Sequence, residues 1–198
     1  MIANSAGTHQ SLDGFIATCR TLIENERPIA EITRAMEELV AEPAALGAQI
    51  PEPVISPDTS IAGVDEILFE DDSLTVFVVH SASDVRQPPH DHRISAVIGV
   101  YEGTEEQRYF RRDGGSLVRS GGADIGPGDV LTLGPAAIHA IGSTGSWCRA
   151  IHVYLGPLSS IDRSLFDPDT FDEEPMTVER YAEFCRSAVP GGSVNVEG

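Results

Sequence analysis

The sequence predicts a mainly β fold, a barrel or sandwich of short strands that is preceded by helices. Between residues 67 and 155, short β-rich runs alternate with turn clusters such as Gly114-Gly115 and Pro127-Gly128-Asp129. Before them, apolar residues recur at helical spacing. Many short strands at close spacing are typical of sandwiches and barrels.

Two helices are predicted at the start of the chain. Residues 12–23 repeat apolar side chains at helical spacing, and Ser11 is a candidate N-cap. Arg27-Pro28 interrupts the pattern, and a second apolar stripe begins at Ile29 and continues to Leu39. Because each helix has a single apolar face, we expect both to pack against the outside of the barrel.

Three regions are predicted, namely a helical extension at 1–49, the barrel at 60–160, and a C-terminal loop with a short helix at 161–198. Prolines at 51, 53 and 57 mark the linker between the first two. The predicted strands cover 67–69, 74–80, 94–101, 107–111, 130–133 and 147–155. Gly121-Gly122 is interpreted as a turn, and residues 177–188 as the final helix.

Composition narrows the class of protein. The chain has 198 residues, 41% of them hydrophobic, and a formal net charge of -18. Such an acidic chain without a basic stripe is not expected to bind nucleic acid or an anionic membrane. The three cysteines are widely spaced, and the chain carries no signal-peptide pattern and no long apolar run, so we expect a cytoplasmic protein without disulfides. It is expected to be a monomer or a small homo-oligomer.

The histidines carry the strongest chemical signal. His90 and His92 stand two residues apart, so on an extended strand both imidazoles point to one face. His139 follows the turn at 127–129 and a strand, which could return a third imidazole to the first two. Three neutral imidazoles can hold one metal ion and leave positions open for substrate or water. Two histidines two residues apart are, on their own, more often structural. Together with the turn at 127–129 and His139, they predict a metal site.

These residues resemble the two sequence motifs of the cupin superfamily. Ala96 and Val97 stand where most cupins carry a glutamate ligand. A three-histidine site without that carboxylate is similar to the cysteine dioxygenase-like branch. The resemblance, over residues 65–160, implies a double-stranded β-helix barrel that holds Fe(II) on the three histidines. It also implies oxidation of a small thiol by O2 to a sulfinic acid.

The late strand around His152 and Tyr154 extends the resemblance. In that family the tyrosine hydroxyl lies beside the bound substrate, and the histidine supports it by hydrogen bonding. Ala150 replaces the family's serine, so the relay is expected to be one hydroxyl shorter. Val97 occupies the position of the cysteine that crosslinks to the tyrosine in animal enzymes, so no such crosslink is expected.

The substrate remains open at this stage. The stretch 60–70 lacks the arginine that holds the substrate carboxylate in cysteine dioxygenases. Arg86 and Arg93, which flank the histidine pair, are the predicted substrate-binding residues. Cysteine and other mercapto acids are both possible substrates. The alternatives are another metal-dependent cupin reaction, such as isomerisation, hydrolysis or C–C oxidation, and a cupin that only binds a small ligand. The acidic segment 167–174 could either close over the site or remain solvated.

Overall fold

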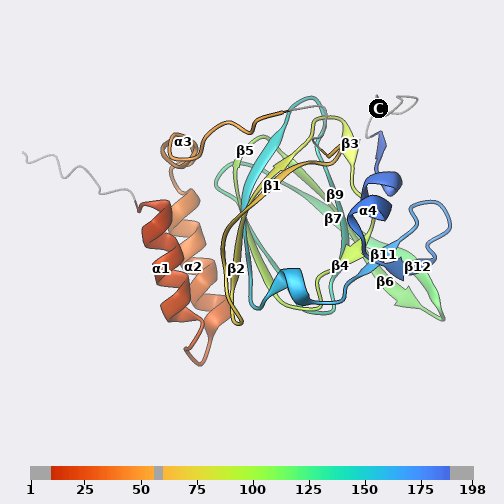
Figure 1. The fold of residues 1–198 in the computed structure, drawn as a ribbon, viewed down its shortest axis with the longest axis horizontal. Helices are drawn as coiled ribbons and strands as arrows, with labels where there is room; N and C mark the ends of the chain where they lie inside the picture. Colours follow the sequence, from red (N-terminus) through yellow and green to blue (C-terminus); the bar gives the residue numbers. More distant parts are fainter. Residues whose placement is uncertain (1–9, 56–59, 188–198) are drawn as a thin grey trace, which may run out of the picture.

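The structure, a computed structural model, describes residues 10–55 and 60–187. In this part of the chain two antiparallel sheets enclose the barrel interior, and helices pack on the outside (Figure 1). The predicted fold class, a mainly β cupin-type barrel with N-terminal helices, is confirmed.

The first sheet has five strands, and its central strands are buried on both faces. One face turns toward the interior of the barrel and the other lies under the N-terminal helices. Its strands, in spatial order, are β1 (Gly63–Glu70), β2 (Thr75–Ser81), β10 (Cys148–Tyr154), β5 (Ala96–Glu102) and β8 (Val130–Leu133).

The second sheet is assembled from shorter strands and includes the C-terminal part of the chain, where a loop was expected. Its main path is β12 (Glu173–Pro175), β11 (Ser164–Phe166), β4 (His90–Asp91), β9 (Ile138–Gly142), β3 (Val85–Arg86) and β13 (Arg186–Ser187). The long hairpin of β6 (Glu105–Asp113) and β7 (Ser116–Ile125) joins this sheet where β6 pairs with β9.

The helices occupy both sides of the barrel (Figure 1). On one side, α1 (Leu12–Leu22), α2 (Pro28–Val40) and α3 (Pro43–Gly47) share a hydrophobic cluster with the first sheet, in which Phe15, Met36 and Val153 are fully buried. On the other side lies α4 (Val178–Phe184), and the 3-10 turn Leu158–Ser160 lies between the two sides, at the lower edge of the barrel in this view. No helix in the described residues is long and apolar enough to cross a membrane.

The predicted turn at Gly121-Gly122 is wrong. Both glycines lie inside β7, where they pair with Tyr109 and Arg108 of β6. A Cβ atom on Gly122 would lie 2.6 Å from the carbonyl oxygen of Gln107, so a glycine is needed because the two backbones approach closely. Most of β7 is exposed and lacks apolar alternation, which is the signal that would have predicted a strand.

Gly99 sets how closely α2 lies on β5. A Cβ atom there would lie 2.5 Å from Met36 Sδ and 2.8 Å from Val40 Cγ1. We therefore expect Gly99→Val to push the helix away and to lower the free energy of unfolding by about 1–3 kcal/mol. Urea denaturation measures this, and Gly134→Val, at a position with no neighbour within 4 Å, is the control. Equal destabilisation by both variants would contradict the close helix contact.

Candidate metal centre

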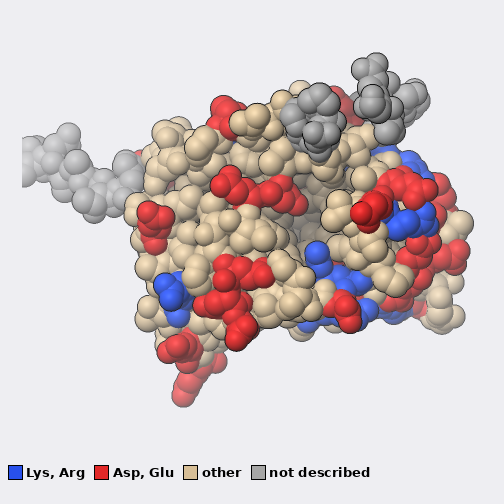
Figure 2. Space-filling view, viewed as in Figure 1, with Lys and Arg blue, Asp and Glu red and all other residues tan. Residues whose placement is uncertain are grey.

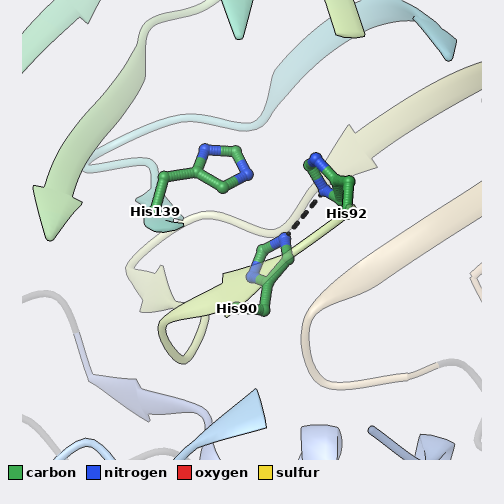
Figure 3. A group of neighbouring side chains, drawn as sticks. All are labelled: His90, His92 and His139. Atoms are coloured by element: carbon green, nitrogen blue, oxygen red, sulfur yellow. Dashed lines mark hydrogen bonds between the residues drawn. The ribbon is translucent and has the colours of Figure 1, made fainter. Parts of the chain in front are cut away.

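The three predicted histidines meet inside the barrel, on the second sheet. His90 on β4 is the direct antiparallel partner of His139 on β9. His92 follows β4 immediately, and Arg93 then turns the chain with a positive φ of 56°. Figure 3 shows the three rings pointing toward one another. Strand pairing thus supplies two of the rings and a short extension of β4 the third.

The three rings are close together and almost inaccessible to solvent. One ring nitrogen from each lies within 4.8 Å of the others, and Nε2 of His90 is 3.2 Å from Nε2 of His92. At most 5% of each residue is exposed. Loss of water lowers the pKa of His90 to about 4 and the pKa values of His92 and His139 well below their usual range. All three imidazoles are therefore neutral at pH 7, which is the form that binds metal ions.

Neighbouring acceptors set the tautomers of two of these histidines. Nδ1 of His90 lies 3.0 Å from the carbonyl oxygen of Pro88, which can only accept, so this nitrogen donates. Nδ1 of His139 donates in the same way to Oε1 of Gln107 at 2.7 Å. Nε2 of each ring is then left with a free lone pair, and Nε2 of His139 has no hydrogen-bond partner.

The donor set fits a metal ion. Two nitrogen ligands held at about 2.1 Å from one ion are themselves about 3.0–3.4 Å apart, close to the separation of His90 and His92. A buried nitrogen without a partner is costly in an apolar interior, and a metal ion would satisfy it. His90, His92 and His139 therefore fit a metal site, with Pro88 and Gln107 orienting two of the rings.

His152 and Tyr154 lie beside this cluster, on the facing sheet. Both side chains project from β10 into the interior, and His152 Nδ1 is 3.0 Å from the Tyr154 hydroxyl. The Tyr154 ring packs edge-on against His92 with 4.8 Å between the ring centroids. Burial strongly raises the pKa of Tyr154, so the isolated hydroxyl keeps its proton. The structure thus brings together all five residues predicted as metal ligands or catalytic groups.

A cavity of about 560 Å³ joins these groups to the solvent. Its walls come from both sheets and from the C-terminal segment, including Phe77, Asp65, Ile141, Arg163 and Tyr181. Figure 2 shows a hollow on the face between the β1 and α4 sides of the molecule, where acidic side chains predominate. The hollow is large enough for a small organic substrate.

The predicted substrate arginines lie outside this cavity. Arg86 faces Glu106 at 3.7 Å, and Arg93 donates to the Ser164 hydroxyl at 2.8 Å. Arg163 lines the cavity instead, and it has no ion-pair or side-chain hydrogen-bond partner among the described residues. The chain turns outward at Arg93, and the side chain of Arg86 points to the opposite face of its sheet. Both arginines are close to the histidines in sequence, but neither side chain enters the cavity.

Other polar residues that the sequence brings to attention have structural partners. Arg149 is buried, and its guanidinium contacts Glu102 and Glu52 at 2.9 Å each and His80 at 3.2 Å. Glu102 is therefore no metal ligand, and His80 does not line the cavity. Cys148 is buried in the core, and His9 lies outside the described residues.

The acidic segment 167–174 does not line the cavity. The C-terminal residues that line the cavity are Met176, Thr177, Val178 and Tyr181. Tyr181 donates to Oε1 of Gln87, and its ring lies 5.7 Å from that of His90, centroid to centroid. Sequence reasoning missed Tyr181 and Arg163 because they come from a segment that lacks a motif.

Comparison with known proteins finds only distant likenesses. No protein-family profile matches the chain. The DMSP lyase DddQ from Ruegeria pomeroyi DSS-3 has 18% sequence identity over 77% of each chain, with a TM-score of 0.45. Oxalate decarboxylase from Bacillus subtilis has 14% identity over 43% of this chain, with a TM-score of 0.37, and the match spans only 22% of the decarboxylase. Such distant likenesses transfer neither activity nor substrate to this chain.

We expect the protein to bind one divalent metal ion per chain. Calorimetric titration of metal-free protein with Zn²⁺ measures the stoichiometry and affinity. His139→Ala removes a ligand and should weaken binding about tenfold or more. The control is His80→Gln, which alters a buried histidine outside the cluster. Unchanged affinity in the His139 variant would contradict the assigned ligand set.

Proposed function

We propose that the protein is a mononuclear non-haem iron dioxygenase that oxidises a small thiol to a sulfinic acid. The reaction is R–SH + O2 → R–SO2H, in which both oxygen atoms are transferred to sulfur and no further reductant is needed. The proposed substrate is a thiol that also carries a carboxylate group.

The observation that carries this proposal is the Tyr154–His152 pair beside three neutral histidines. The cluster that can hold a metal contains only imidazoles among the described residues. Neutral ligands leave the charge of a divalent ion uncompensated, which favours an anionic ligand such as a thiolate. The Tyr154 ring packs against His92 from the facing sheet, and its hydroxyl contacts His152. Together these features suit a substrate that loses a proton from sulfur.

A ferrous ion on His90, His92 and His139 would supply the redox chemistry with O2. The surrounding residues have separate tasks. Tyr154 provides a hydroxyl at the reacting end of the cavity, and His152 supports that hydroxyl at 3.0 Å. Phe77, Ile141 and Leu158 give the cavity apolar walls, which limit the access of water.

Arg163 is the proposed carboxylate-binding residue. Its guanidinium lines the cavity and has no carboxylate partner within 4 Å among the described residues. A guanidinium can bind a carboxylate through two parallel hydrogen bonds, which fixes the orientation of the substrate as well as its position. Asp65 also lines the cavity and could bind the ammonium group of a thiol that carries one.

Oxygen uptake tests the reaction. Anaerobically iron-loaded protein is mixed with cysteine, cysteamine, 3-mercaptopropionate or mercaptosuccinate, and His90→Ala, which lacks one of the three histidines, is the control. We expect uptake with one O2 per sulfinate formed. Tyr154→Phe should lower kcat about a hundredfold with little change in KM, because a hydroxyl that assists proton movement contributes on this scale. Tyr101→Phe, at an equally buried tyrosine outside the cavity, is the matched control.

No uptake with stoichiometrically bound iron would overturn the dioxygenase assignment. A metal-dependent reaction that proceeds without oxygen, or binding of a small ligand without turnover, would then account for the site.

The carboxylate assignment makes a separate prediction. Arg163→Gln should raise KM about 10- to 100-fold for 3-mercaptopropionate, since a charge-assisted bidentate contact is lost. KM for cysteamine, which has no carboxylate, should stay within about twofold. Arg93→Gln is the control, because Arg93 lies outside the cavity. An equal rise in KM for both thiols would show that Arg163 does not recognise the carboxylate.

A further inference from the structure

Glu105 is a carboxylate with no exposed surface, and nothing in the proposed reaction so far uses it. Glu105 is the first residue of β6. Gln107, two residues further along this strand, is also buried and points to the same interior face. A buried carboxylate costs several kcal/mol unless its oxygens are satisfied. The contacts of Glu105 are therefore informative.

Each oxygen of Glu105 faces a different part of the site. Oε1 accepts a hydrogen bond from Nε2 of Gln107 at 2.5 Å. Oε2 lies 3.6 Å from Nε2 of His152, and neither of these two atoms has another partner. These two atoms face each other in the buried interior, and a slightly shorter distance between them would complete a hydrogen bond.

On the Gln107 side, the contacts lead to a metal ligand. Because the amide nitrogen of Gln107 donates to Glu105, its oxygen faces Nδ1 of His139 at 2.7 Å. This arrangement puts the proton of His139 on Nδ1 and leaves Nε2 free for the metal. Glu105 thus orients the amide that orients the ligand.

On the His152 side, the contacts lead to Tyr154. A carboxylate oxygen can accept but not donate, so this contact favours the tautomer of His152 that carries its proton on Nε2, facing Glu105. In that tautomer Nδ1 is an acceptor, and the Tyr154 hydroxyl 3.0 Å away donates to it. The oxygen of Tyr154 keeps its lone pairs for the cavity, where they can accept a hydrogen bond from a substrate.

We propose that Glu105 is a positioning carboxylate that sets the ring tautomers of His152 and, through Gln107, of His139. One buried side chain thereby orients both the Tyr154 pair on one sheet and a metal ligand on the other. Ala150 replaces the serine of the thiol dioxygenases and has no hydroxyl to offer His152. The carboxylate of Glu105 faces Nε2 of His152 instead. Its effect on turnover rests on the proposed function, but the tautomers do not.

The tautomers can be measured directly. Long-range ¹H–¹⁵N NMR of ¹⁵N-histidine-labelled, metal-free protein distinguishes Nδ1–H from Nε2–H rings, and without metal the tautomer of His139 is not fixed by coordination. In the wild type we expect His152 to carry its proton on Nε2 and His139 on Nδ1. His152→Gln, from which one spin system disappears, assigns the signals. A wild-type His152 protonated on Nδ1 alone would overturn the proposal without any variant of Glu105.

Glu105→Gln keeps the shape of the side chain but introduces a donor. With its amide oxygen toward Gln107, its NH2 group faces His152 and should move the proton of that ring to Nδ1. If the new amide instead turns its NH2 group toward Gln107, the amide of Gln107 must also turn. Nδ1 of His139 then faces an NH2 group and loses the oxygen that accepted its proton. Either change in tautomer supports the proposal, and two unchanged tautomers would overturn it. Glu106→Gln, at the adjacent residue whose side chain binds Thr144 outside the cavity, is the matched control.

Kinetics separates this inference from the function it rests on. If the thiol reaction occurs, Glu105→Gln should lower kcat about 10- to 100-fold with KM nearly unchanged, and Glu105→Asp, which retains the carboxylate, should restore part of that loss. Failure of thiol oxidation in the wild type would overturn the proposed function and leave the NMR result standing. Full kcat in Glu105→Gln would overturn the positioning role and leave the function intact.

Discussion

Burial of three imidazoles in the interior of a β barrel is the constraint on which the rest of the site depends. The rings of His90, His92 and His139 are nearly free of water, so each polar nitrogen needs a partner. Pro88 and Gln107 satisfy two of them from the backbone and from a neighbouring strand. Of the remaining nitrogens, one from each ring lies within 4.8 Å of the others, and this proximity makes the cluster suitable for a metal ion.

The hydrogen bonds around the cluster form a chain that crosses the barrel. It leads from His139 through Gln107 and Glu105 to His152 and Tyr154, with one longer contact of 3.6 Å between Glu105 and His152. Every member is buried, and a buried polar network is stable only when its members satisfy one another. His139 and the Tyr154 hydroxyl are therefore linked through buried side chains, although they project from different sheets.

The outer layer makes this arrangement rigid. Helix α2 lies directly on β5 at Gly99, and the buried Arg149 joins the end of β5 to the segment before the barrel through Glu102 and the carbonyl oxygens of Ile50 and Pro51. The first sheet is thus fixed from outside while its inner face carries His152 and Tyr154. On a chain with a net charge of -18, the Arg163 side chain lines the cavity without an ion-pair partner among the described residues.

The sequence by itself determined the three histidines, the pair on the late strand and the class of fold. These depend on local rules, because residues two apart on a strand share a face wherever the strand lies. It did not determine Glu105, Gln107 or Arg163, and it placed Arg86 and Arg93 nearer the site than they are. Which strands pair, and in which register, is settled by contacts far apart in the chain, such as that of β6 with β9. Only the tertiary structure decided which polar groups the buried histidines would meet, because that choice follows from burial and strand pairing.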